Sequence, residues 1–331
     1  MSGGRGKETR IVMVGAGGVA QRHVRVLSGL ADVRVVAVVD PQPGAAKTLA
    51  ATCHAEGFLD VEEALDAADA DAVYVCVPPF AHGAPERVVL ARQLPLFVEK
   101  PVAAGLAVAE ELGGLVADSG VVTGTGYHWR CLDTVGRAQD LLAASPAMLA
   151  CAYWLDKRPP VPWWAHNDRS GGQVVEQLTH ILDLARVLLG EVAEVHAMGA
   201  RIPPSEVGED RGDVDDVTAA SVRFVSGAVG TLAATSLLTA KHRAGLHLFG
   251  PGLALELSET ALLVDDGNSR TEHRPAVDPR LTVDREFIQA VRGGAPTRAP
   301  YAEGLRTHRV ACAVVESVRT GKPVRLVPDH R

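Results

Sequence analysis

The first 125 residues alternate between short aliphatic runs and longer amphipathic segments. The aliphatic runs lie at 11–14, 33–39, 72–77, 96–98 and 121–124. Strands of a parallel sheet are covered on both faces, so they appear in a sequence as continuous apolar runs. One of the intervening segments begins at Asp60 with Glu63 three residues on, which is a variant of the helix capping box. The pattern predicts βαβ units around a doubly wound parallel sheet, an α/β fold.

The pattern changes after residue 125. Strand-like stretches follow at 150–155, 192–198, 218–225, 228–237 and 245–257, several of them without an intervening helix. Successive strands joined by short turns are typical of an antiparallel sheet. Two helices are expected to close the chain, at 283–292 and 301–320. We therefore expect a flexible leader over 1–9, one domain over 10–126, and an α+β domain over 127–331 with a large, mainly antiparallel open sheet.

A glycine-rich turn follows the first aliphatic run. Its sequence, Gly15-Ala16-Gly17-Gly18-Val19-Ala20, is the G-x-G-x-x-A pattern between a strand and a helix. The first glycine allows the tight turn, the second lets the backbone approach a pyrophosphate, and the final small residue permits close packing of helix and strand. The start of the helix adds free N–H groups and a partial positive charge. The turn therefore predicts a dinucleotide site in the first domain.

Asp40 makes this prediction more specific. It ends the second predicted strand, where an acid can accept hydrogen bonds from the adenosine ribose hydroxyls. A 2′-phosphate beside this carboxylate would bring like charges together, at roughly 4 kcal/mol for unit charges about 4 Å apart near a surface. NAD is therefore expected as cofactor, with NADP less favoured. The alternative is that Asp40 only caps the turn before Pro41.

Composition limits the class of protein. The chain has 331 residues, of which 47% are hydrophobic and 22% charged, as in a soluble globular protein of two domains. The net charge of −7 provides no basic surface for nucleic acid, and no apolar run is long enough to cross a membrane. Five widely spaced cysteines without a CxxC pattern are typical of reduced thiols, so we expect a cytoplasmic protein. The twelve histidines have no zinc-ligand spacing, so no metal is expected.

Two further groups of residues follow later strands. Pro78 and Pro79, with His82, follow the third aliphatic run, and Glu99-Lys100-Pro101 follows the fourth. In a doubly wound sheet both lie at the carboxyl edge, where the cofactor crevice opens. Pro101 restricts the backbone of Lys100 and permits a cis bond, and either would fix where the ammonium points. A surface salt bridge between Glu99 and Lys100 is the alternative.

A third group lies on a helix that begins after Gly171-Gly172. On a regular helix Gln173, Glu176, His180 and Asp183 share an arc of about 80° opposite an aliphatic face. The arc contains no Lys or Arg, and histidine has a pKa suited to proton transfer near neutral pH. An ordinary solvated face is the alternative.

Taken together, these residues resemble the Gfo/Idh/MocA family of NAD(P)-dependent oxidoreductases. The resemblance covers essentially the whole chain and rests on Gly15 to Ala20, Pro78-Pro79 with His82, Glu99-Lys100-Pro101, Gly126-Tyr127, and Gly171-Gly172 followed by Glu176, His180 and Asp183. It implies a Rossmann domain and a substrate-binding domain whose sheet often makes the interface of a homodimer or homotetramer. It also implies that Lys100 and His180 face the nicotinamide and substrate. Glu176 stands where many inositol dehydrogenase-like members have Asp.

The expected activity is hydride transfer between the nicotinamide and a secondary alcohol or ketone of a sugar, amino sugar or cyclitol. His180 is expected to be the acid/base, Lys100 to stabilise the alkoxide, and Glu176 to orient substrate or histidine. Two alternatives stay open: a glycoside hydrolase that uses NAD for transient oxidation, and a non-catalytic nucleotide-binding regulator. The retention of both Lys100 and His180 argues against the regulator. The acidic stretch 206–216 would suit a cationic amino sugar, unless it is only a solvated loop.

The tryptophans are concentrated in one part of the chain. All four fall within residues 129–164, between the last strand of the first domain and the helix with His180. Aromatic faces interleaved with hydrogen-bonding groups suit polyhydroxylated rings. The residues expected to contact the substrate here are Tyr127, Trp129, Arg158, Trp163 and Trp164. The alternative is that the tryptophans pack an interface between the domains.

Overall fold

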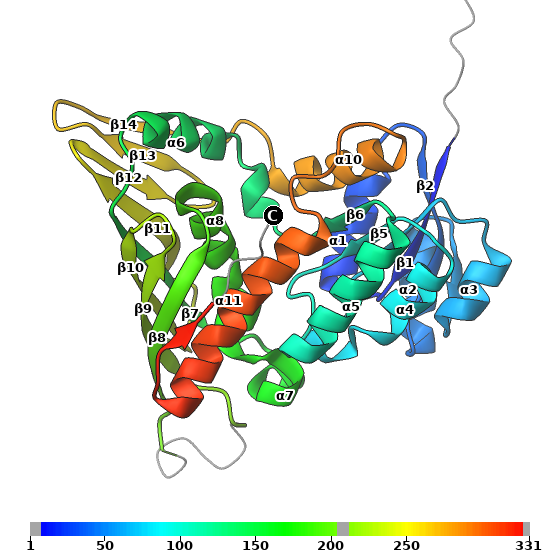
Figure 1. Ribbon diagram of the computed structural model, residues 1–331. Helices are drawn as coiled ribbons and strands as arrows, with labels where there is room; N and C mark the ends of the chain where they lie inside the picture. The colour runs from blue at the N-terminus through cyan, green and yellow to red at the C-terminus, as the bar shows by residue number, and fades with distance from the viewer. Residues whose placement is uncertain (1–7, 204–211, 327–331) are drawn as a thin grey trace, which may run out of the picture. The chain divides into compact units, whose positions relative to one another are not determined.

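The structure, a computed structural model, describes residues 8–203 and 212–326 (Figure 1). Most of the predicted leader and residues 206–211 of the acidic stretch lie outside this part. The chain divides into two compact units. The first comprises Met1–Ala103, Ala107–Tyr127 and Arg280–Gly304, and the second Ala104–Leu106, His128–Pro279 and Leu305–Arg331. The chain thus returns to the first unit near its end, which a contiguous division of the sequence does not anticipate.

The first unit contains a sheet of six parallel strands in the order β3-β2-β1-β4-β5-β6 (Figure 1). Its elements are β1 (Thr9–Val14), α1 (Gly18–Leu27), β2 (Val33–Val39), α2 (Pro43–Thr52), β3 (Glu56–Phe58), α3 (Val61–Ala67), β4 (Ala72–Val75), η1 (Pro79–Ala81), α4 (Ala84–Ala91), β5 (Leu96–Val98), α5 (Leu106–Ser119), β6 (Thr123–Thr125) and α10 (Pro279–Val291). This is the doubly wound order whose topological switch lies between β1 and β4. The predicted α/β class is confirmed.

The returning segment belongs to the core of the first unit. Phe287 of α10 packs edge-on against Tyr74 and Phe97, with ring centroids 5.3 and 5.4 Å away. Tyr74 and Phe97 stack on each other at 4.6 Å, and all three side chains are buried. A Cβ at Gly124 would lie 2.9 Å from Phe97 and 3.0 Å from Phe287, so the aromatic cluster requires glycine there. Aromatic packing therefore explains why α10 joins the parallel sheet.

The second unit is built on nine strands in the order β14-β13-β12-β11-β7-β10-β9-β8-β15 (Figure 1). Its elements are η2 (His128–Cys131), α6 (Asp133–Ala144), β7 (Leu149–Lys157), η3 (Pro162–Ala165), α7 (Asn167–Ser170), η4 (Val174–Leu178), α8 (Thr179–Leu189), β8 (Val192–Ala200), β9 (Val217–Phe224), β10 (Val229–Leu238), β11 (Arg243–Gly250), β12 (Leu253–Leu257), β13 (Leu262–Asp265), β14 (Arg270–His273), α11 (Tyr301–Thr320) and β15 (Val324–Arg325). All pairings are antiparallel except that of β7 with β10.

One strand prediction in this sheet is wrong. The stretch 245–257 was expected to form a single strand, but it is the hairpin of β11 and β12. Gly252, with φ +68°, lies in the turn that separates the two strands. The apolar alternation continues through the hairpin because both strands present the same face to the core, so the pattern alone conceals the turn.

The two faces of the nine-stranded sheet are buried to different extents. On one face Ala150, Ala152 and Trp154 of β7 belong to a core shared with apolar residues of α6, α8 and α11. On the other face the intervening residues are only partly covered, and apolar side chains such as Met198, Val229 and Leu149 are exposed. The prediction of a mainly antiparallel open sheet is confirmed. Among the described residues, no helix combines the length and the apolar character needed to span a bilayer.

Candidate active site

The glycine-rich turn between β1 and α1 has the shape needed for a pyrophosphate. Gly15 has φ +97°, and a Cβ on it would lie 2.3 Å from the carbonyl oxygen of Cys76, so only glycine fits. At Gly17 and Gly18 no atom lies within 4 Å of the position a Cβ would take, and both residues are exposed. No side chain caps the start of α1, so its first N–H groups face this open space. The turn therefore fits a dinucleotide.

Asp40 holds the same turn in place. Its Oδ2 accepts a hydrogen bond from the backbone N–H of Ala16 at 2.9 Å, and its Oδ1 accepts one from Gln42 at 2.9 Å. Asp40 therefore caps the turn after β2 and also braces the glycine-rich turn. An ionised carboxylate has about four acceptor positions, so two remain for ribose hydroxyls. The capping role and the ribose-binding role are compatible.

Glu99 does not form the surface salt bridge considered as the alternative. The side chain is buried at the end of β5, and its Oε2 accepts from the backbone N–H of Lys100 at 2.8 Å. Its Oε1 accepts from Arg22 Nη2 at 3.0 Å and lies 2.9 Å from His23 Nε2. Burial raises the pKa of Glu99, but the hydrogen bond and charge of His23 and the charges of Arg22 and Lys100 outweigh it, lowering the pKa to about 2. Glu99 is a permanent anion that fixes the main chain of Lys100.

The backbone around Lys100 is closely fitted to this carboxylate. The Lys100–Pro101 peptide bond is cis, one of the two arrangements expected from the sequence. A Cβ on Gly126 would lie 2.3 Å from Glu99 Oε2, so glycine at that position leaves room for the carboxylate. Lys100 is half-buried. The main chain of Lys100 is therefore held by the buried carboxylate of Glu99.

His82 is oriented by an acid one helical turn away. Its Nδ1 lies 2.5 Å from Glu86 Oε1, while Glu86 Oε2 accepts from the backbone N–H of Gly83 at 2.6 Å. The ring is buried, and its Nε2 has no hydrogen-bond partner among the described residues. Pro79 is buried and Pro78 half-buried in the preceding loop. The pair with Glu86 therefore leaves Nε2 as the nitrogen that can bind a ligand or water.

In the second unit, the helix that carries His180 does not begin as a regular helix. Gly171 and Gly172 have φ +75° and +84°, and a π-helical turn, η4, precedes α8. Residues in a π turn advance by less than 100° each, so the angles of a regular helix do not apply between Glu176 and His180. A Cβ on Gly171 would lie 2.6 Å from the carbonyl oxygen of Ala104, which explains the glycine. Such π turns are frequent at functional sites.

Two of the four polar residues predicted on one helix face have structural partners. Gln173 donates to the carbonyl oxygen of Thr235 at 2.6 Å. Asp183 is completely buried and accepts from Arg130 Nε and Nη2 at 2.6 and 2.7 Å and from Thr307 Oγ1 at 2.6 Å. Glu176 is only partly buried, and its Oε2 accepts from the indole N–H of Trp164 at 3.1 Å. Glu176 thus differs from Gln173 and Asp183 in keeping part of its side chain exposed.

Aromatic rings surround His180. Its ring is nearly parallel to those of Trp154 and Trp129, at 24° and 19° with centroids 5.9 and 6.2 Å away. His128 packs against it edge-on at 4.8 Å. Because Arg130 is bonded to Asp183 of α8, the short helix η2 that carries His128 and Trp129 is held against the helix of His180. The surrounding rings restrict the orientation of this imidazole.

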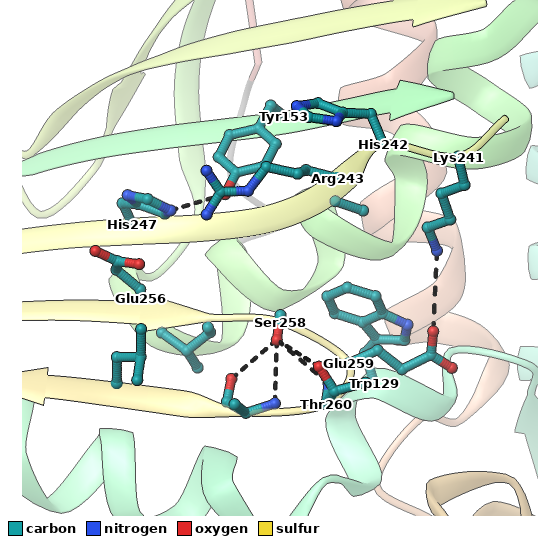
Figure 2. Close-up of a pocket in the computed structure, with 14 residues that line it drawn as sticks. Trp129, Tyr153, Lys241, His242, Arg243, His247, Glu256, Ser258, Glu259 and Thr260 are labelled. Carbon is teal, nitrogen blue, oxygen red and sulfur yellow. Dashed lines mark hydrogen bonds and ion pairs between the residues drawn. The ribbon is translucent and has the colours of Figure 1, made fainter. Parts of the chain in front are cut away.

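A pocket of about 480 Å³ in the second unit begins beside this aromatic group (Figure 2). Lys241, between β10 and β11, has its Nζ 4.4 Å from the ring centroid of Trp154 and 4.0 Å from Glu259. Glu259 Oε1 in turn lies 3.6 Å from His128 Nε2. Neither Lys241 nor Glu259 is among the site residues predicted from the sequence. The basic run Lys241-His242-Arg243 at a strand end was the available signal.

The aromatic residues predicted to contact substrate are mostly buried. Tyr127, in the first unit, and Trp129 and Trp164, in the second, are at most 1% exposed. Trp163 and Arg158 are half-buried, and the guanidinium of Arg158 lies 5.7 Å from the ring centroid of Trp164. The described residues contain no group of three His, Cys, Asp or Glu arranged for a metal ion.

Comparison with known proteins places the chain in a family. Residues 9–127 match the model described as an oxidoreductase family with NAD-binding Rossmann fold, GFO_IDH_MocA, and residues 146–254 match the GFO/IDH/MocA C-terminal domain. The chain belongs to the GFO/IDH/MocA family. It is thus an NAD-binding oxidoreductase, which confirms the resemblance, the cofactor and the enzyme class expected from the sequence.

Several relatives of the family match along their whole length. Inositol 2-dehydrogenase of Rhizobium meliloti is 28% identical over 96% of this chain and 99% of its own, and scyllo-inositol 2-dehydrogenase (NAD(+)) of Bacillus subtilis is 25% identical over 96% of both. Among solved structures, levoglucosan dehydrogenase in complex with NADH and levoglucosan has a TM-score of 0.86 at 19% identity, covering 97% of this chain and 100% of that one. The structural likeness establishes the common fold.

Proposed function

We propose that the protein is an NAD-dependent dehydrogenase or ketoreductase that acts on a secondary alcohol or ketone of a sugar, amino sugar or cyclitol. The observation that carries the proposal lies at the carboxyl edge of the parallel sheet. The glycine-rich turn, Asp40 and Lys100 follow β1, β2 and β5, whose carboxyl ends share this edge. A lysine with a fixed main chain thus lies on the cofactor side of the sheet. The curated inositol dehydrogenases among the relatives support the substrate class.

The cofactor is assigned to residues of the first unit. The pyrophosphate is assigned to the turn, the adenosine ribose to Asp40, and the nicotinamide half to the later loops at the same edge. The full set is Gly15, Gly17, Gly18, Val19, Ala20, Asp40, Pro78, Pro79, His82, Glu99 and Lys100. When bound, NAD supplies the hydride acceptor for the reaction.

We assign one side chain to transfer the proton of the reacting alcohol and another to stabilise the negative charge on its oxygen. His180 takes the hydroxyl proton as the alcohol is oxidised and returns it in the reverse direction. The ammonium of Lys100 donates a hydrogen bond to the same oxygen and stabilises the negative charge that develops there. The near-parallel tryptophan rings beside His180 restrict its orientation, which favours a fixed path for the proton.

Glu176 is assigned to substrate orientation. Trp164 holds one of its carboxylate oxygens, which leaves acceptor positions for substrate hydroxyls. Trp163, Arg158 and Lys241 retain exposed surface and are the candidates for direct contact with the substrate. Tyr127 and Trp164 are buried, so we assign them to the support of the site, whereas Trp129, though buried, lines the pocket.

The open face of the second sheet is assigned to self-association. Its exposed apolar side chains include Met198, Leu149, Val229 and Phe249, and β-sheet pairing places the last three in one row. We infer a homodimer or homotetramer formed through this face. Val229→Asp is expected to give a smaller species in light scattering, while Arg137→Asp, at an exposed position of α6, is not. An unchanged mass for Val229→Asp would contradict this interface.

The experiment for the proposed activity measures NADH formation. The protein is incubated with NAD and, in turn, cyclitols, free sugars, amino sugars and nucleotide sugars. A dehydrogenase produces NADH in proportion to oxidised substrate, whereas a hydrolase that only oxidises transiently releases an aglycone without net NADH. A protein that binds NAD but transforms none of these substrates would fit the regulator and contradict the proposal.

A further inference from the structure

A buried histidine in the first unit has a carboxylate on each side. His23 lies on α1, directly after the glycine-rich turn, and its side chain is 1% exposed. Its Nδ1 lies 2.7 Å from Asp284 Oδ1 on α10, and its Nε2 lies 2.9 Å from Glu99 Oε1. Glu99 and Asp284 are buried as well. The three residues connect the cofactor turn, the loop of Lys100 and the segment that returns from the end of the chain.

With both acids ionised, this arrangement requires a protonated ring. Burial raises the pKa of Asp284, while the charge and hydrogen bond of His23 act in the opposite direction. A neutral imidazole has one N–H and one lone pair, so one of its nitrogens would direct a lone pair at a carboxylate. With both nitrogens protonated, His23 donates to both acids. Burial lowers the pKa of His23, but the charges and hydrogen bonds of Asp284 and Glu99 outweigh it and raise the pKa to about 9. Arg22 and Lys100 are the other charged groups close to Glu99, and the rings of Tyr74 and Phe97 pack against His23.

We propose that His23 is a positioning residue for the oxidoreductase reaction, an imidazolium that ties Glu99 to Asp284 and thereby fixes the main chain of Lys100. The inference rests on the catalytic role of Lys100 proposed above. His23 itself is buried behind Glu99 and contacts neither cofactor nor substrate in this assignment.

Glu99 is the link through which His23 acts. One of its oxygens accepts from the Lys100 N–H, and the other is shared between Arg22 and His23. Gly126 leaves the carboxylate no spare room on one side, because even a Cβ there would lie 2.3 Å from Oε2. Without the imidazolium, two buried carboxylates, Glu99 and Asp284, would lose their common counter-charge. Glu99 would then take up a proton or move, and the Lys100 main chain would move with it.

The test replaces His23 by glutamine. In His23→Gln the turnover number is expected to fall by about 10- to 100-fold, the scale of a misplacement near 1 Å, while KM for NAD changes by only a few-fold. The control is Arg25→Gln, which removes a positive charge from an exposed position of the same helix. Arg25→Gln is expected to keep the turnover of the wild-type protein.

Measuring the effect of His23→Gln in the Lys100→Met variant distinguishes a positioning role of His23 from a purely structural one. In Lys100→Met the residual turnover is measured with and without His23→Gln. If His23 acts through Lys100, the second substitution has little further effect on turnover, although it lowers the melting temperature in both backgrounds. An equal loss of turnover in both backgrounds would overturn the inference. Wild-type turnover in Lys100→Met alone would refute the proposed function instead, and the positioning role would fall with it.

A measurement on the wild-type protein avoids any dependence on folding of the variant. In nitrogen-15 NMR of histidine-labelled protein, one imidazole is expected to stay protonated at both nitrogens up to about pH 8, more than one pH unit above the usual histidine pKa. In Asp284→Asn the same signal is expected to lose its proton at lower pH, which assigns it to His23. If every histidine of the wild-type protein titrates at its usual pKa, the imidazolium is absent and the inference is wrong.

Discussion

Each unit contains a buried carboxylate close in sequence to a proposed catalytic residue, and the two carboxylates are neutralised in different ways. Glu99 precedes Lys100 and is bonded to Arg22 and His23. Asp183 follows His180 on α8 and accepts from Arg130 and Thr307. The first cluster includes a histidine that can lose its proton, whereas the basic groups at Asp183 are arginines, which stay charged throughout the working range.

The two kinds of counter-charge lead us to expect a pH-dependent geometry around Lys100. The two parallel bonds from Arg130 fix the short helix η2 against α8. In the proposed arrangement, the cluster at Glu99 keeps its geometry while His23 is protonated. We therefore expect the frame of Lys100 to be sensitive to alkaline pH.

The largest expected effect comes from removing the groups that the two clusters support. His180→Ala and Lys100→Met are each expected to lower turnover by about 10²- to 10⁴-fold, because each removes a positioned proton-transfer or charge-stabilising group. The measurement is the initial rate of NADH formation at saturating NAD. His196→Ala, on the exposed face of β8, is the control for loss of a histidine. Turnover within a few-fold of the wild-type value would refute the assignment.

The next effect concerns the cluster at Asp183. Asp183→Ala removes the carboxylate that accepts two hydrogen bonds from the buried guanidinium of Arg130, which is expected to cost about 3–5 kcal/mol in the free energy of unfolding. Denaturant unfolding measures this difference. Asp168→Ala, at an exposed position of α7, is the matched control and is expected to change stability little. A small effect in Asp183→Ala would mean that the cluster contributes no rigidity.

The cluster at Glu99 predicts a pH dependence of stability. The pKa of Glu99 falls from 4.5 to about 2 on folding, so its contribution is complete above pH 4.5 and is lost as the pH falls toward 2. The pKa of His23 rises from 6.5 to about 9, so its contribution is complete below pH 6.5 and is lost as the pH rises through 9. For these two groups stability is greatest between pH 4.5 and 6.5. In melting temperatures measured against pH, His23→Gln is expected to remove the alkaline decline, and its persistence would count against the account.

The smallest effect tests the bond between Trp164 and Glu176. Trp164→Phe keeps an aromatic ring but removes the indole N–H, which is expected to cost about 1 kcal/mol in substrate binding and to raise KM about fivefold. Trp163→Phe provides a comparison at the neighbouring, half-buried position. An equal KM for wild-type protein and Trp164→Phe would show that Glu176 needs no support from the indole.

The sequence predicts the architecture well because its signals are local. The glycine-rich turn and the long apolar runs of the first unit lie where the pattern places them. Strand β3 was missed because its three residues, Glu56–Phe58, form no apolar run. The π turn was missed because hydrophobic spacing alone does not separate it from a regular helix.

The clusters around the two carboxylates could not be predicted because they depend on contacts between distant residues. His23 is 76 residues from Glu99 and 261 from Asp284, and Arg130 is 53 residues from Asp183. In the sequence His23 looks like an ordinary helix residue. Asp183 looks like part of a polar face, yet it is fully buried among its partners. Local patterns indicate which residues are polar, but only the fold determines which of them are paired.

The stoichiometry of NADH and oxidised product with a cyclitol or sugar substrate decides whether the protein is a dehydrogenase. For the wild-type protein we expect NADH in equal amount to the ketone formed. In both Lys100→Met and His180→Ala we expect the rate of NADH formation to collapse. Substrate conversion without net NADH, or NADH formation that survives both substitutions, would contradict the proposed function.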